Sequence, residues 1–269
     1  MKLKSFLAVV VVMAASLLQA QGVKQLAREV YQTSGMNLMV KNIDQQFASQ
    51  LDMHPSLANN PETGPYKKAM LQVLNAKNLE KLFLTYLEEE VPLAELETMV
   101  KLYKNPMVQE FSLLEQGLLQ PEKQKELVAF REQLVANPPS ADRLKLVDRL
   151  IDDQKTAETA MDMTTTMVGA MIRGGNAMLP EAQRLDEEQI SERMKKSFPP
   201  NFEMLMRQSI QANCLFAYKD VDDEKLARYV SLWQSDEGRT TAQHVMEALA
   251  TAFAQIGEQM GKSLASVKK

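Results

Sequence analysis

The sequence predicts an all-α protein, a multi-helix array of about ten to twelve amphipathic helices in two similar halves. Helix-forming Leu, Ala, Glu, Gln, Lys and Met dominate the chain, which holds only 10 glycines and 11 prolines. No segment alternates apolar and polar residues for long enough to indicate a strand. Apolar residues instead recur at helical spacing, as in the stripe Leu96, Met99, Val100 and Tyr103.

Glycine, proline and small polar residues mark the expected ends of these helices. Gly35 can take the left-handed conformation that ends a first short helix. The stretch 52–65 is rich in Pro, Asn and Gly and is typical of a loop. A capping residue followed by a first-turn proline predicts a helix start at 105–106, and 138–140 should end one helix and cap the next. The glycine pair 174–175 is expected to break the second half.

The first twenty residues have the pattern of a secretory signal peptide. Lys2 and Lys4 give a basic start, an apolar run covers residues 6–18, and Ala20 supplies a small residue at the expected cut. No cysteine follows the run to accept a lipid anchor, and no second long apolar run predicts a transmembrane segment in the mature chain. We therefore expect a protein that is periplasmic or secreted.

Removal of residues 1–20 would leave 249 of the 269 residues, enough for one large or two modest domains. Loss of Lys2 and Lys4 changes the net charge from −4 to −6. A mildly acidic chain without a basic block argues against nucleic acid as a partner. The single cysteine, Cys214, cannot form an intramolecular disulfide, and we expect it to be a small buried residue.

The chain resembles itself at two offsets. At an offset of 130, residues 86–119 lie over residues 216–249, and at an offset of 120, a block near residue 31 lies over one near residue 151. Any two amphipathic helices can be laid over each other, but two blocks in the same order with matching breaks favour a duplication. We therefore expect one helical unit over 21–137 and a second over 140–269. The pairs include Val91 with Val221, Leu96 with Leu226, Tyr103 with Trp233, Tyr31 with Ile151, and Ile43 with Met163.

The repeated block resembles an exported bacterial family of helical domains of unknown function, numbered two thousand and fifty-nine. The family signature is a helix ending in an aromatic residue, then x-Ser-Pro-x-Gly, opening a second helix. The first copy reads Tyr-Lys-Asn-Pro over 103–106 and lacks the glycine, and the second reads Trp-Gln-Ser-Asp-Glu-Gly over 233–238 and lacks the proline. The resemblance covers about 50 residues per copy. It implies an exported helical domain and no established activity.

This signature has a direct physical interpretation as a corner between two helices. The aromatic residue ends one helix and stays buried, and the Asn or Ser accepts free N–H groups of the next helix. No catalytic role is expected for these side chains. The corner residues are Tyr103, Asn105 and Pro106 in the first copy, and Trp233, Ser235 and Gly238 in the second.

Catalytic and metal-binding patterns are sparse. The chain has two histidines, His54 in the predicted loop and His244 within a helix, and no phosphate-binding loop, nucleophile elbow or zinc-protease motif. If the protein were an enzyme, the nearest set for a site would be His244, Glu247 and Asp236. We predict no catalytic residue, no metal and no cofactor.

Methionine is the most unusual component, with 18 residues in the chain. Met163, Met167 and Met171 lie at helical spacing, with Met161 nearby. Thioethers select Cu(I), but no histidine accompanies them, and the same spacing is typical of an ordinary core stripe. A third interpretation is a pliable apolar groove for a lipid, a peptide or a partner helix.

These observations favour a non-enzymatic binding or interaction module, with a protein, peptide or lipid as its partner. A self-associating structural or assembly protein is the alternative, and a hydrolase with an unrecognised site ranks third. The oligomeric state is left open by the sequence.

Overall fold

The computed structural model describes residues 20–41, 43–44, 48, 64–177 and 179–267. Almost all of the predicted signal peptide, the predicted loop up to residue 63, and His54 lie outside these residues. Within them the protein is all-α: helices account for the regular structure and no strand occurs. This confirms the predicted fold class.

Residues 20–33 are helical, and twelve further α-helices have defined bounds. In chain order they are α2 Met36–Lys41, α5 Gly64–Val73, α6 Ala76–Glu90, α7 Leu93–Tyr103, α8 Pro106–Gly117, α9 Pro121–Ala136, α10 Ala141–Asp153, α11 Thr156–Ala177, α12 Glu187–Lys196, α13 Phe202–Ala217, α14 Asp223–Gln234 and α15 Asp236–Ser266. A short 3-10 helix, η2, covers Glu181–Gln183.

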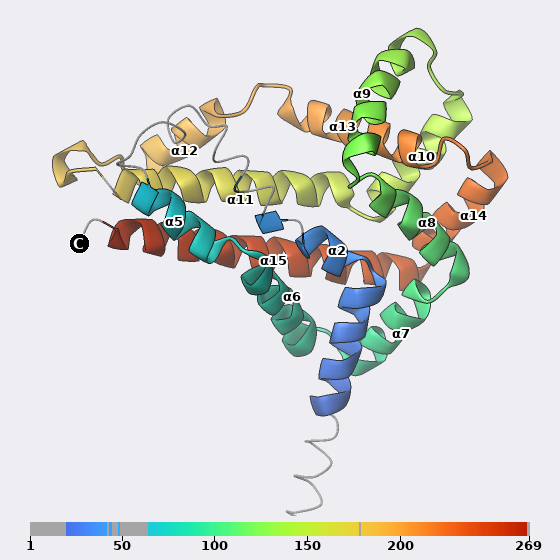
Figure 1. Ribbon diagram of the computed structural model, residues 1–269, viewed down its shortest axis with the longest axis horizontal. Helices are drawn as coiled ribbons and strands as arrows, with labels where there is room; N and C mark the ends of the chain where they lie inside the picture. Colours follow the sequence, from blue (N-terminus) through green and yellow to red (C-terminus); the bar gives the residue numbers. More distant parts are fainter. Residues whose placement is uncertain (1–19, 42, 45–47, 49–63, 178, 268–269) are drawn as a thin grey trace, which may run out of the picture.

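Two long helices form the spine of the molecule. Helices α11 and α15 lie side by side and run in the same direction along its longest axis (Figure 1). Helices α5, α6 and α7 pack on α15, whereas α12 and α13 pack on α11. Among the described residues, no helix is both long enough and apolar enough to cross a membrane.

The apolar stripe of α15 explains its central position. Buried residues follow one another at spacings of three and four along nearly the whole helix, which is the pattern of a face in continuous contact with a core. Several of these residues are alanines, whose small side chains let neighbouring helices approach closely. The buried hydrophobic residues of α15 are Ala242, Val245, Ala248, Leu249, Ala252, Phe253, Ile256, Met260 and Leu264.

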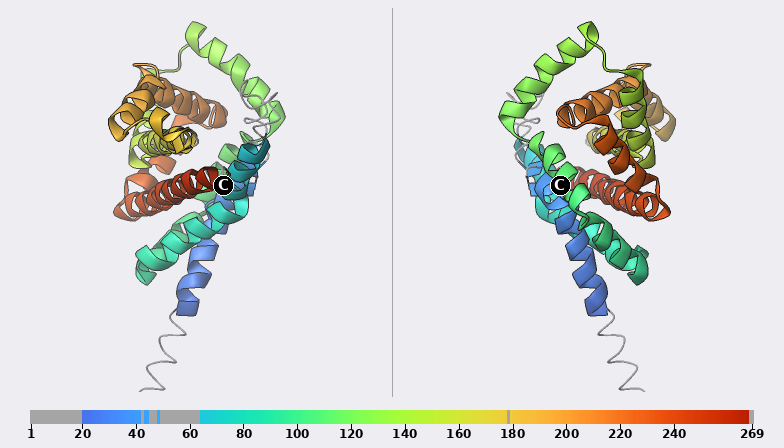
Figure 2. Two further views of the ribbon diagram at one scale, coloured as in Figure 1. Left: turned by 90° about the vertical axis from the view of Figure 1, so that its left-hand side faces the viewer. Right: turned by 90° about the vertical axis from the view of Figure 1, so that its right-hand side faces the viewer.

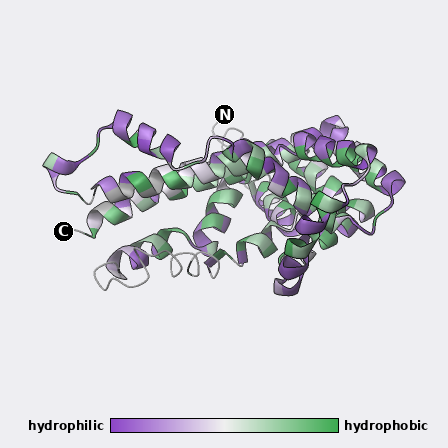
Figure 3. Ribbon diagram, turned by 90° about the horizontal axis from the view of Figure 1, so that it is seen from above, coloured by the Kyte–Doolittle hydropathy of each residue, from purple (hydrophilic) through white to green (hydrophobic). Residues whose placement is uncertain are grey.

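Most helices carry both hydrophilic and hydrophobic residues, as Figure 3 shows. Helix α12 is mainly hydrophilic and has one buried residue, Ile190. Helix α9 stands away from the rest of the molecule in both views of Figure 2. It touches the body through Phe130, whose ring lies 5.3 Å from that of Phe216, while Val135 remains 88% exposed.

The structure corrects two expectations about helix boundaries. The glycine pair 174–175 does not break the helix but lies in the last turns of α11, which continues to Ala177. The chain leaves the helix just afterwards, where the Asn176 side chain accepts from the N–H of Leu185 at 2.7 Å and donates to its carbonyl at 2.8 Å. Pro65 belongs to the first turn of α5 rather than to a loop, a position where its missing N–H costs no hydrogen bond.

Several backbone features recur at the two offsets found in the sequence. Helix α14 begins 130 residues after α7, and α15 begins 130 residues after α8. Helix α11 begins 120 residues after α2. Within the described part of the chain, positive φ angles occur at Gly35 (80°) and Lys155 (52°), again 120 residues apart.

Close packing at the second corner requires glycine at position 238. A Cβ atom there would lie 2.2 Å from the carbonyl oxygen of Leu232 and 2.6 Å from the Cα of Trp233, both backbone atoms. We therefore expect Gly238→Ala to lower the free energy of unfolding by about 1–3 kcal/mol, as overpacking does elsewhere. Urea unfolding followed by circular dichroism measures the change.

Gly261→Ala is the matched control, because this glycine lies in the same helix and a Cβ there meets nothing within 4 Å. That variant should gain about 0.5–1 kcal/mol from the better helix propensity of alanine. Equal stability of the two variants would contradict the close approach at the corner.

Candidate functional site

The centre of the candidate site is the carboxyl group of Glu115. Helix α8 buries Val108 and Phe111, and Glu115 follows on the same face, one turn beyond Phe111. The residue as a whole is half-buried, and the burial of its carboxyl group raises its pKa. The otherwise apolar face of α8 therefore places the ionisable side chain of Glu115 against the interior.

Two buried tyrosines hold this carboxyl group. The hydroxyl of Tyr218 donates to Oε1 of Glu115 at 2.5 Å, and the hydroxyl of Tyr229 donates to the same oxygen at 3.1 Å. These bonds oppose the rise in the pKa of Glu115 without removing it. Burial and the neighbouring carboxyl raise the pKa of both tyrosines well above the usual value, so both hydroxyls remain protonated donors at neutral pH.

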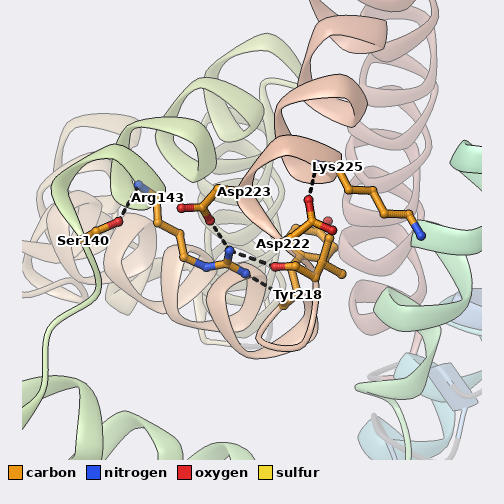
Figure 4. Close-up of polar contacts among 7 residues, drawn as sticks. Ser140, Arg143, Tyr218, Asp222, Asp223 and Lys225 are labelled. Atoms are coloured by element: carbon orange, nitrogen blue, oxygen red, sulfur yellow. Dashed lines mark hydrogen bonds and ion pairs between the residues drawn. The ribbon is translucent and has the colours of Figure 1, made fainter.

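Arg143 of α10 fixes the turn that positions Tyr218 (Figure 4). Its guanidinium donates to the carbonyl of Tyr218 at 2.5 Å and to that of Val221 at 3.0 Å, and it forms an ion pair with Asp223. The side chain is only 15% exposed. Arg143 therefore ties the end of α13 and the start of α14 to α10, and it is a positioning residue for the Tyr218–Glu115 hydrogen bond.

An aromatic cluster surrounds the carboxyl group. The ring of Tyr229 stacks on Phe111 with a centroid distance of 3.9 Å and meets Trp233 edge-on at 6.2 Å. Trp233 in turn packs edge-on against Tyr103 at 6.0 Å. Among the described residues, no acceptor meets the hydrogen-bond geometry for the buried indole N–H of Trp233, although the nearby indole opposes the rise in the pKa of Tyr229.

A cavity of about 190 Å³ lies against this cluster. Residues from both halves of the sequence line it, and ten of its thirteen lining residues form pairs at the two offsets. The pairs are Ser34 with Gln154 and Met36 with Thr156 at an offset of 120, and Tyr103 with Trp233, Ser112 with Ala242, and Glu115 with Val245 at an offset of 130. The remaining lining residues are Val108, Tyr229 and Met246.

The carboxyl group of Glu115 lacks a counter-charge. No cationic side chain in the described part of the chain contributes to its pKa, which only burial and the two tyrosine hydroxyls shift. Isolated buried carboxylates are costly, and they either take up a proton or find a positive partner. The cavity therefore combines an acid that has no cationic partner with an aromatic wall.

Two larger depressions are less suited to be the site. One of about 670 Å³ lies along α5 and α6, and its charges of both signs partly neutralise one another, as in the 3.6 Å ion pair of Arg28 and Glu80. Another, of about 410 Å³, has Asp152 and Arg207 on its wall, which are hydrogen-bonded to each other at 2.7 Å. Neither combines an aromatic wall with a carboxyl group that lacks a cationic partner.

The residues considered for an enzyme form a different constellation. His244 Nε2 contacts Oε2 of Glu95 at 2.5 Å, and its Nδ1 lies 4.0 Å from Oε2 of Glu247, which also accepts from the hydroxyl of Tyr86 at 2.7 Å. Asp236 lies apart, exposed in the first turn of α15 and two helical turns from His244. The network joins α6, α7 and α15, and no Ser, Thr or Cys of the described chain hydrogen-bonds His244.

The predicted methionine set does not converge on one place. Met163 and Met167 are partly buried and pack against the hydrophobic core, whereas Met161 lines the 410 Å³ depression. The side chain of Met171 lies outside what the structure describes. In the described residues, no group of three or more His, Cys, Asp or Glu side chains is placed to hold a metal ion.

Two of the six corner residues, Tyr103 and Trp233, line the cavity. Asn105 accepts from the N–H of Met107 at 2.9 Å, and Ser235 accepts from the N–H of Gly238 at 3.0 Å, so each begins the second helix of its corner. Pro106 occupies the first turn of α8. The aromatic residues that end the two preceding helices meet each other and form one wall of the cavity.

Glu115, Tyr218 and Tyr229 are absent from the residues that the sequence predicted for a site. Tyr229 lies at helical spacing with Leu226 and Trp233, which marks it as a core residue and gives no signal for its hydroxyl. The available signal was Glu115 itself, an acid placed on the face of α8 that begins with Val108 and Phe111. Comparisons with protein-family models, curated proteins and solved structures found no match for the chain. The family resemblance therefore rests on the sequence motif alone.

The raised pKa of Glu115 makes Glu115→Gln a stabilising substitution at neutral pH. The folded state binds this proton more tightly than the unfolded state. The contribution of Glu115 to the free energy of unfolding is therefore most favourable below the ordinary carboxyl pKa, and it is lost as the pH rises through the raised pKa of the folded state. We expect Glu115→Gln to raise the free energy of unfolding at neutral pH by about 0.5–2 kcal/mol. Urea titrations from acidic to neutral pH should show the gain growing with pH and then levelling.

Glu110→Gln is the control on the same helix. Glu110 is exposed and pairs with Lys225, so its loss should change stability by no more than about 1 kcal/mol, and not upward. A Glu115→Gln variant less stable than the wild type at neutral pH would contradict the dominance of burial at Glu115.

Cys214 should be unreactive in the folded protein. Burial, reinforced by Glu115, raises the pKa of its thiol to about 12, which leaves almost no thiolate at neutral pH. We expect alkylation by iodoacetamide at mildly alkaline pH to be at least tenfold slower than for the same chain in urea. Mass spectrometry of the single thiol measures both rates, and equal rates would show that the thiol is accessible.

Proposed function

We propose that the chain is an exported, non-enzymatic binding protein built from two diverged copies of one helical unit, and that the cavity between their corners is its binding site. The export part of the proposal rests on the basic start, apolar run and small residue of positions 1–20. The binding part rests on one observation, the uncompensated Glu115 carboxyl group at an aromatic cavity.

The recurrence of helix starts and positive φ angles at the offsets of 120 and 130 supports the duplication. The contacts between the corners add to this support. Tyr103 and Trp233 are equivalent residues, and equivalent residues that touch lie on a two-fold axis in symmetric assemblies. The contacts beside them are reciprocal: Glu95 of α7 reaches α15, and its equivalent Lys225 of α14 reaches α8.

The departures from this symmetry support a binding role for the cavity. At the offset of 130, Glu115 corresponds to Val245 and Ser112 corresponds to Ala242. The first copy therefore supplies polar residues to the cavity, and the second copy supplies apolar residues at the equivalent positions. A core under selection for stability alone would be expected to carry an apolar residue in place of a buried, unpaired acid. Residues that are kept at a cost in stability are typical of functional sites.

One observation favours self-association as a second candidate function. Four large apolar residues of the α8–α9 region are exposed, with Val135 at 88% and Leu113 at 68%. Helix α9 projects from the body, where a second copy has room to pack against it (Figure 2). Sedimentation at increasing concentration tests this candidate, because a monomer at all concentrations excludes it.

Native mass spectrometry of the protein isolated from the envelope fraction of its own cells tests the binding proposal. We expect a mass excess that disappears on denaturation. A Ser112→Leu variant, which fills the cavity from α8, should lack this excess, whereas Ser231→Leu on the exposed face of α14 should retain it.

Two outcomes would reject the cavity as the binding site. One is a wild-type protein that carries no excess mass under any native condition. The other is a bound species that Ser112→Leu retains in full while its circular dichroism matches that of the wild type.

A further inference from the structure

We infer that the cavity beside Glu115 binds a small organic ammonium ion, whose N–H group donates to Glu115 and whose carbon atoms pack against the aromatic wall. This inference rests on the proposed function and names the class of ligand for the same site. It is carried by the hydrogen-bonding pattern of the carboxyl group, by the lining of the cavity and by the cavity volume.

The hydrogen bonds of Glu115 leave one oxygen for a ligand. Both tyrosine hydroxyls donate to Oε1, and no residue of the described chain donates to Oε2. A carboxylate has room for about four hydrogen bonds, so Oε2 can accept a hydrogen bond from a ligand. A donor that carries a positive charge also supplies the missing counter-charge.

The remaining lining residues suit the carbon atoms of such an ion. Tyr103, Tyr229 and Trp233 provide aromatic surface, which attracts organic cations through the ring quadrupole. Met36 and Met246 add thioether side chains that adapt to irregular shapes. An inorganic cation is disfavoured, because a metal ion needs several hard ligands and Glu115 is the single acid among the described residues of this wall.

The volume suits a ligand of a few heavy atoms. A cavity of about 190 Å³ holds about six water-sized groups at roughly 30 Å³ each. n-Butylammonium, with five heavy atoms, meets this limit. n-Butanol has the same chain length without the charge and is its neutral counterpart.

Trp233 provides the readout, because it is the only tryptophan of the chain and it lines the cavity. Titration of the full-length mature protein with n-butylammonium chloride should change the tryptophan fluorescence saturably. We expect n-butanol to bind at least tenfold more weakly, and sodium chloride at the same ionic strength to have no effect.

Two variants test whether the ammonium ion binds at Glu115. Glu115→Gln should weaken n-butylammonium binding at least tenfold while leaving n-butanol binding unchanged. Glu110→Gln, which removes an exposed acid from the same helix, should bind both compounds as the wild type does. Equal binding of n-butylammonium by wild type and Glu115→Gln would overturn the inference.

Proton release gives a second readout that does not depend on fluorescence. Because burial favours the protonated acid in the empty cavity, binding of a cation should expel that proton. Calorimetry in two buffers of different ionisation enthalpy measures this release, which should be absent for n-butanol and for Glu115→Gln. The measurement is made at a pH where Glu115 of the empty site is protonated. If the wild type then binds the cation without releasing a proton, the inference is also overturned.

Failure of this inference can be separated from failure of the proposed function. If n-butanol binds as well as n-butylammonium and Ser112→Leu abolishes both, the cavity is a binding site for neutral ligands and only the ligand class is wrong. If Ser112→Leu leaves binding of both unchanged, the cavity is not the site and both proposals fail.

Discussion

The buried face of α15 is the packing surface on which the rest of the structure depends. Its apolar stripe contacts α5, α6 and α7 of the first sequence half, and α11 and α14 of the second. One hydrophobic core therefore includes residues from both halves, from Ala27 to Leu264. The corners meet because this shared core brings α7 and α14 to neighbouring sides of the same helix, and the cavity forms where they meet.

Local signals in the sequence predicted the helical architecture well. Each residue of the stripe Leu96, Met99, Val100 and Tyr103 is buried, because a spacing of three and four residues defines one face of a helix. Gly35 takes a positive φ after the first helix, as its position suggested. The pair 174–175 misled the prediction, because glycine weakens a helix by only about 1 kcal/mol, and packing against α15 and α12 outweighs that.

The site was much harder to predict, because its residues converge from distant positions. Glu115 and Tyr218 are 103 residues apart, and Glu115 and Tyr229 are 114 apart. Helical periodicity states which face of a helix is buried, but not which other helix covers that face. The sequence places His244 one turn from Glu247 on the same helix, yet the shortest contact of its ring is with Glu95, 149 residues away.

The unequal lengths of α8 and α15 have a consequence for whether either half of the sequence can fold without the other. Helix α8 has 12 residues, whereas its counterpart α15 has 31 and extends for about 46 Å at 1.5 Å per residue. The added turns carry Phe253, Ile256 and Met260, which lie in the core shared with the first half. Neither segment retains a complete interior when cut from the other, so cleavage at the prolines of 138–139 would leave two fragments that each expose apolar surface.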